Sequence, residues 1–92
     1  MAKHVDGSNS KNEVFLYALS TCVWCKKTRM FLEEIGVCYD YEYLDLLDDD
    51  ERDKAMSEME AFNPDGGFPT MVINKTHVII GFKPEEIKKV LA

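Results

Sequence analysis

The sequence predicts a single α/β domain with a four-stranded mixed sheet flanked by three helices. The run from Glu13 to Ala18 is rich in β-formers and indicates a buried central strand. From Val37 to Leu44, tyrosines alternate with acidic side chains, which is the period of a half-buried edge strand. Apolar side chains recur at helical spacing in three other segments, and 92 residues leave room for one domain.

The predicted elements follow the order βαβαββα, and local signals mark their ends. They are strand 13–18, helix 24–35, strand 37–44, helix 49–62, strands 70–73 and 77–80, and a helix from residue 84. Gly36 is a usual C-terminal stop, Asn63-Pro64 ends the second helix, and Pro84 suits the first position of the last one. Because a helix links the first two strands, we expect them to be parallel, with the hairpin adding an antiparallel strand.

Composition and charge exclude several classes of function. The net charge of −6 argues against nucleic-acid binding, which needs a basic surface. No apolar run approaches the ~20 residues that cross a bilayer, and residues 1–12 lack the apolar centre of a secretory signal. We therefore expect a monomer of the reducing cytoplasm with no membrane association, a loosely ordered tail at residues 1–12 and one domain at residues 13–92.

The segment Cys22-Val23-Trp24-Cys25 carries the clearest functional signal. It stands between the first predicted strand and the first predicted helix, and a Cys-x-x-Cys pair in this position indicates a redox site. The free N–H groups and the dipole of a helix N-terminus stabilise a thiolate, so Cys22 is the predicted nucleophile and Cys25 its disulfide partner. Three cations that favour the charged form follow directly, namely Lys26, Lys27 and Arg29.

Half of a zinc or iron–sulfur site is the alternative interpretation of the cysteine pair. Such sites normally have four ligands, and the remaining cysteine and histidines, Cys38, His4 and His77, match no recognised metal spacing. We therefore expect no metal and no bound cofactor in the monomer, while a cluster that bridges two chains stays open. Cys38 is expected to serve as a small apolar side chain.

The order of elements, the Cys-x-x-Cys pair after the first strand and Pro69 just before the third strand resemble the glutaredoxin branch of the thioredoxin superfamily. The resemblance covers residues 13–92 and implies a thioredoxin-like fold with a cis peptide bond before Pro69. It also implies that the backbone of Phe68 pairs with a substrate peptide, or with glutathione, as an extra strand. The implied function is that of a dithiol–disulfide oxidoreductase that reduces protein disulfides and carries electrons.

Three positions depart from the glutathione-dependent members of that family. Leu19, Gly67 and Pro84 stand where those members offer a lysine, a threonine and an aspartate. The stretch from Gly81 to Glu85, with Cys-Val-x-Cys, resembles NrdH-type redoxins instead. This second resemblance implies a thioredoxin reductase, or another reductase, as electron donor and ribonucleotide reductase as a protein substrate, with glutathione as the alternative donor. The residues expected to bind the substrate lie between the two cysteines, before the third predicted strand and after the fourth. They are Val23, Trp24, Phe68, Pro69, Gly81, Phe82 and Lys83.

Overall fold

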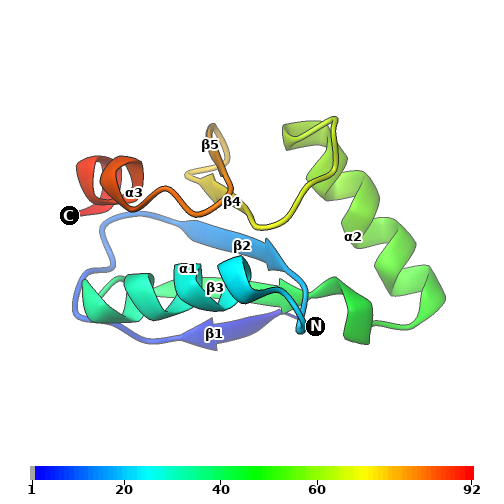
Figure 1. The fold of residues 1–92 in the computed structure, drawn as a ribbon, viewed down its shortest axis with the longest axis horizontal. Helices are drawn as coiled ribbons and strands as arrows, with labels where there is room; N and C mark the ends of the chain where they lie inside the picture. The colour runs from blue at the N-terminus through cyan, green and yellow to red at the C-terminus, as the bar shows by residue number, and fades with distance from the viewer. Residues whose placement is uncertain (1) are drawn as a thin grey trace.

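The computed structural model describes residues 2–92 and shows a five-stranded sheet with helices on both faces (Figure 1). The elements in chain order are β1 (Lys3–Val5), β2 (Val14–Ala18), α1 (Val23–Glu34), β3 (Tyr39–Tyr43), a 3₁₀ turn (Leu44–Leu46), α2 (Asp49–Phe62), β4 (Thr70–Ile73), β5 (His77–Ile80) and α3 (Pro84–Leu91). The predicted α/β fold with three helices is confirmed. None of the helices in this range is long and apolar enough to span a bilayer.

The sheet is mixed and has the strand order β1-β3-β2-β4-β5. β2 and β3 are parallel, as the helical connection between them predicts, whereas β4 is antiparallel to β2 and β5 is antiparallel to β4. The turn between β4 and β5 contains Asn74 and Lys75 with φ of 54° and 62°. Positive φ at both central residues is the geometry of a type I′ turn, which the Thr76 N–H closes by donating to the Ile73 carbonyl oxygen at 3.1 Å.

The prediction of four strands and a loosely ordered tail is wrong at β1. Residues Lys3–Val5 pair antiparallel with β3, so β3 lies inside the sheet and β1 forms its edge. The segment after β1 is also held, because the Asn9 side-chain amide donates to the Leu91 carbonyl oxygen at 2.8 Å. Three residues are too few to show a strand period, and backbone pairing with β3 creates this strand.

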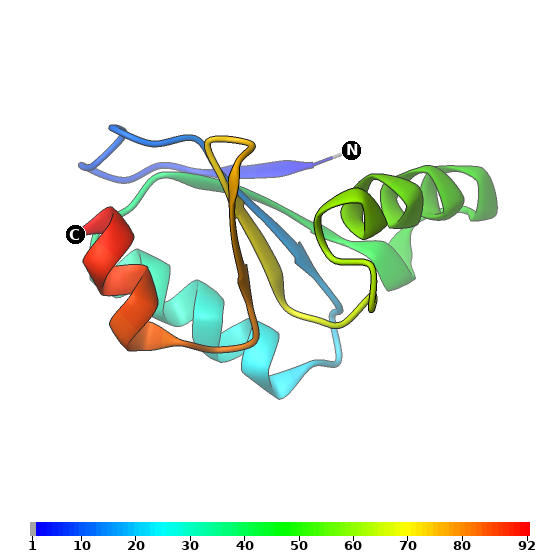
Figure 2. The same cartoon turned by 90° about the horizontal axis from the view of Figure 1, so that it is seen from above.

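Two apolar clusters fill the space between the sheet and its helices. One cluster joins α1 and α3 to one face and includes Leu16 and Leu32, while the other joins α2 to the opposite face and includes Tyr17 and Met59. Figure 2 shows α1 and α3 together, apart from α2. Leu16, Leu32 and Met59 are fully buried, and burial of such a side chain contributes about 1.5–3 kcal/mol.

The sheet register brings three connecting segments together at the same end of the strands. Tyr17 near the end of β2 pairs with Thr70 at the start of β4, and Thr70 pairs with Ile80 at the end of β5. The segments after β2, before β4 and after β5 therefore leave the sheet side by side. These three segments and the first turn of α1 contain the residues predicted for catalysis and substrate binding.

Candidate active site

Cys22 occupies the N-cap of α1, after the turn that follows β2. Its backbone N–H donates to the Leu19 carbonyl oxygen at 3.2 Å, which closes this turn. The Cys22 Sγ atom accepts the backbone N–H of Cys25 at 3.1 Å. An N-cap side chain normally satisfies a backbone donor that the helix leaves unpaired, and here that acceptor is a sulfur atom. The sulfur thus lies at the N-terminus of α1, where the positive end of the helix dipole is located.

Cys25 differs from Cys22 in exposure. Cys25 lies in the first turn of α1 and is fully buried, whereas Cys22 is partly exposed, and neither is in a disulfide in this structure. Burial, with a smaller contribution from the neighbouring Cys22, raises the pKa of Cys25 to about 12. The Cys25 thiol therefore stays protonated at neutral pH. Cys22 is thus the more accessible of the two thiols, and its role as the nucleophile stays a prediction.

Asp45, in the 3₁₀ turn after β3, holds the segment that leads to Cys22. Its carboxylate accepts the backbone N–H of Ser20 at 2.9 Å and also accepts the Ser20 hydroxyl. The hydrogen bond from the Ser20 side chain lowers the pKa of Asp45. Sequence reasoning missed this role, because Asp45 belongs to a run of acidic residues that by itself predicts a solvated loop.

A groove of about 290 Å³ opens beside the first turn of α1. It is lined by residues from that turn, from the segment before β4 and from the segment after β5, namely Trp24, Phe68, Pro69, Gly81 and Phe82. The rings of Trp24 and Phe82 stack with their centroids 6.1 Å apart, and Trp24 is 56% exposed. The groove therefore offers aromatic surface to a binding partner next to the cysteine pair.

The peptide bond between Phe68 and Pro69 is cis, as the resemblance implies. Two buried polar side chains hold this segment. The Thr70 hydroxyl donates to the Gly67 carbonyl oxygen at 2.6 Å, and the Asn63 side-chain amide donates to Thr70 Oγ1 at 3.0 Å and to the same carbonyl at 3.3 Å. The sequence marks Asn63 only as a helix stop, so this network is visible only in three dimensions.

Two of the seven residues predicted to bind the substrate do not line the groove. Val23 and Lys83 are both exposed, and Lys83 forms the N-cap of α3 without a side-chain cap bond. The structure thus brings five of the predicted residues together in one groove. Their role in binding a substrate stays a prediction.

The cations after the cysteine pair have different surroundings. The Lys27 ammonium lies 4.8 Å from the centroid of the Trp24 ring, so it is close to the groove. Arg29 faces β3 instead, where its Nε atom donates to the Tyr39 hydroxyl at 2.9 Å and its Nη1 atom to the Tyr43 hydroxyl at 2.7 Å. Arg29 therefore ties α1 to β3.

The cysteine pair is not part of a group of three metal-ligating side chains. Within residues 2–92, the one such group consists of His4, Asp6 and Cys38. His77 lies in β5, where its Nε2 atom is 3.3 Å from the Glu86 carboxylate. The pair alone has too few ligands for an ordinary zinc or iron–sulfur site, so its geometry in one chain favours redox chemistry.

Comparison with known proteins identifies the family. The glutaredoxin family model matches residues 14–78, which is most of the chain. The chain belongs to the glutaredoxin family. A glutaredoxin from Methanosarcina mazei Go1 is 45% identical, with a TM-score of 0.90 over 99% of this chain and 87% of that protein. Methanoredoxin from Methanosarcina acetivorans is 40% identical, with a TM-score of 0.89 over 94% of this chain and 90% of that protein.

A curated relative adds to this assignment. A glutaredoxin-like 8.6 kDa protein from the rubredoxin operon of Clostridium pasteurianum is 32% identical over 76 residues, which are 83% of this chain and 93% of the relative. The chain is thus a glutaredoxin-like redox protein with a thioredoxin-like fold and a close Cys22–Cys25 pair. Its closeness to NrdH-type redoxins stays a prediction.

Proposed function

We propose that this glutaredoxin-family protein is a dithiol–disulfide oxidoreductase that reduces disulfides of partner proteins and carries electrons in the cytoplasm. The observation that carries the proposal is that the two cysteines differ in their exposure to solvent. Cys22 is partly exposed and its sulfur accepts a backbone N–H, whereas Cys25 is buried one helical turn away. A two-step reduction needs one thiol that is exposed to the substrate and a second, buried thiol beside it.

The proposed reaction has two exchange steps. In the first, the Cys22 thiolate attacks one sulfur of the substrate disulfide, which forms a mixed disulfide and releases the other substrate sulfur as a thiolate that takes a proton. In the second, Cys25 loses its proton and attacks the Cys22 sulfur, and the bound substrate sulfur leaves as a thiolate that is then protonated. The substrate gains two electrons and two protons, and the protein is left with a Cys22–Cys25 disulfide.

The groove supports binding of an extended polypeptide rather than a small charged ligand. Its lining is mainly aromatic and includes Phe68 and the stacked rings of Trp24 and Phe82. In the proposed complex, the Phe68 backbone pairs with the substrate chain next to its disulfide. Lys27, over the Trp24 ring, favours an acidic partner surface.

The proposed electron donor is a protein reductase of the thioredoxin reductase kind. Leu19 packs against the apolar cluster under α2, and Pro84 is the first residue of α3. Neither can form the charged contacts with which glutathione-dependent relatives are expected to hold glutathione. Charge-assisted hydrogen bonds contribute about 1.5–3 kcal/mol each, so the loss of two weakens the binding of a tripeptide by about two orders of magnitude or more.

A coupled assay tests both parts of the proposal. Insulin disulfide reduction is followed with NADPH and thioredoxin reductase, and separately with NADPH, glutathione and glutathione reductase. We expect turnover with the first system and little with the second. Cys22→Ser abolishes turnover, while Met30→Ser, which changes an exposed sulfur side chain on the same helix, leaves it unchanged.

The outcomes separate the donor from the chemistry. Efficient turnover with glutathione alone would reject the reductase but keep the dithiol reaction. Full activity in Cys22→Ser would reject the reaction itself. A disulfide of ribonucleotide reductase is the protein substrate to test next, since the NrdH-type resemblance implies it.

A further inference from the structure

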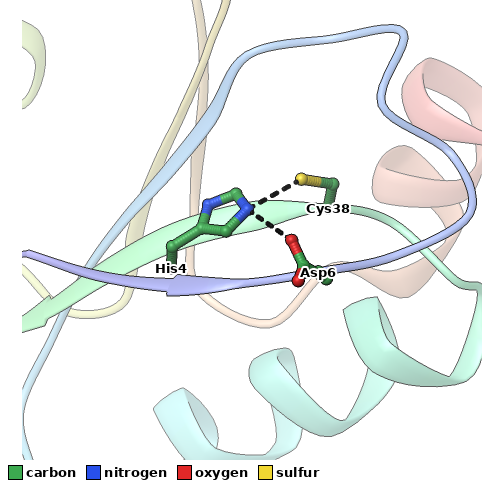
Figure 3. A group of neighbouring side chains, drawn as sticks. All are labelled: His4, Asp6 and Cys38. Atoms are coloured by element: carbon green, nitrogen blue, oxygen red, sulfur yellow. Dashed lines mark hydrogen bonds and ion pairs between the residues drawn. The ribbon is translucent and has the colours of Figure 1, made fainter.

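A cluster of polar side chains lies on the face of the sheet opposite α1, where β1 meets the start of β3. In the antiparallel register, His4 of β1 stands across from Asp40 of β3. Side chains two residues apart in extended chain share a face, so Asp6 and Cys38 continue this arrangement next to that pair. Figure 3 shows one ring nitrogen of His4 facing both the Asp6 carboxylate and the Cys38 sulfur.

The ligand atoms of three of these residues converge. His4 Nε2 lies 2.9 Å from Asp6 Oδ1 and 3.4 Å from Cys38 Sγ, and all three ligand atoms lie within 4.8 Å of one another. In a tetrahedral zinc site, with bonds of about 2.3 Å to sulfur and 2.0–2.2 Å to nitrogen and oxygen, ligand atoms lie roughly 3.3–3.6 Å apart. The observed separations need only small rotations of partly or fully exposed side chains to reach this geometry.

A fourth residue orients the histidine. Asp40 Oδ1 lies 2.5 Å from His4 Nδ1, and a carboxylate in this position accepts a hydrogen bond from the Nδ1–H group. Asp40 keeps the proton on Nδ1, so when a metal ion displaces the Nε2 proton that faces Asp6, the Nε2 lone pair is directed at the ion. A carboxylate behind a histidine, fixing its ring and its tautomer, is the usual support of a metal-binding imidazole.

We propose that His4, Asp6 and Cys38 form a site for one divalent transition-metal ion of the Zn²⁺ class, with Asp40 as the positioning residue. A thiolate and an imidazole select such an ion over Ca²⁺ or Mg²⁺, which prefer oxygen ligands alone. Binding displaces the thiol proton of Cys38 to solvent, and also the Nε2 proton of His4 when the ring is an imidazolium, so the S–H or N–H bond that breaks is replaced by a bond to the metal. Three protein ligands leave the fourth position to water or an added ligand.

The site is separate from the redox pair. Cys22 precedes α1 and Cys38 follows it, and the 12 residues of α1 span roughly 18 Å at 1.5 Å per residue. The ion would join β1 to β3 at the edge of the sheet, where three paired residues otherwise hold β1. Metal binding at this site therefore does not depend on the proposed redox function.

Titration with Co²⁺ tests the proposal, because a Co²⁺–thiolate bond gives a charge-transfer absorption band. The protein used is the full chain with Cys22→Ser and Cys25→Ala, which removes the other two thiols. We expect one Co²⁺ per chain with a thiolate band, displaced by Zn²⁺. The band is lost when Cys38→Ser or His4→Gln is added, and His77→Gln, at a histidine outside the cluster, leaves it unchanged. Asp40→Asn lowers the affinity by about 10–100-fold.

Two results would overturn the proposal. One is the absence of stoichiometric Co²⁺ binding with a thiolate band. The other is binding that survives Cys38→Ser, since that ion would lie elsewhere. Far-UV circular dichroism of each variant shows that it is folded, and because His4→Gln and Cys38→Ser change different strands, a folding defect in one leaves the other as the test.

Discussion

Replacement of Asn63 by alanine should weaken both the fold and the segment that carries Phe68 and Pro69. Asn63 is 2% exposed, and its amide donates to Thr70 Oγ1 and to the Gly67 carbonyl oxygen. Each lost hydrogen bond costs about 1 kcal/mol, and the cavity left by the shortened side chain adds to this cost. We expect the free energy of unfolding to fall by about 2–3 kcal/mol, which lowers the melting temperature by roughly 10–20 °C in a domain of this size.

Calorimetry and two kinetic measurements check this prediction. The KM for a disulfide substrate should rise in Asn63→Ala because the segment before β4 is less well held, while the rate of Cys22 alkylation by iodoacetamide stays the same. Ser57→Ala, at an exposed position of the same helix, is the control and should change stability by less than about 0.5 kcal/mol. A melting temperature of Asn63→Ala within about 4 °C of the wild type, the shift for 1 kcal/mol, would refute the reasoning.

Two further predictions concern Cys25 and Arg29. Burial raises the pKa of Cys25 from 9.0 to about 12, so between these pH values the folded protein holds a proton that the unfolded chain loses. The contribution of Cys25 to the stability of the reduced protein should therefore be fully present below pH 9 and fall as the pH rises towards 12. Melting temperatures across this range should fall less steeply for Cys25→Ala, and equal slopes would contradict the prediction. Arg29→Lys should lower the free energy of unfolding by about 1–3 kcal/mol, because an ammonium group cannot reproduce the planar fork that reaches two tyrosine hydroxyls. Urea denaturation measures this change, and an unaltered midpoint would show that the two guanidinium hydrogen bonds contribute nothing to stability.

The sequence predicts most of the fold because its local signals agree with the three-dimensional packing. The predicted bounds of α2, residues 49–62, are those observed, since Asp48 caps the helix by accepting the Glu51 N–H at 2.8 Å and Asn63-Pro64 ends it. The two hairpin strands also lie where their apolar runs predict them. The redox pair is predicted for the same reason, because its chemistry depends on the helix start beside it.

The features that the sequence does not predict depend on contacts between distant segments. β1 exists because β3 offers it an unpaired edge, and nothing within Lys3–Val5 indicates a strand. The grouping of His4, Asp6 and Cys38 follows from the register of that unpredicted strand, so their spacing along the chain matches no metal motif. The hydrogen bonds of Asn63 have the same origin, since its partners belong to the segment before β4.

Trapping of a mixed disulfide tests the central claim most directly, namely that Cys22 attacks the substrate and Cys25 resolves the complex. The reduced Cys25→Ser variant is mixed with a disulfide substrate, and the product is analysed by intact-mass measurement and peptide mapping. The account predicts one substrate molecule per chain, joined to Cys22, and no stable adduct with the wild type, whose Cys25 releases the substrate. An adduct on Cys38, or a wild-type adduct as stable as that of the variant, would contradict it.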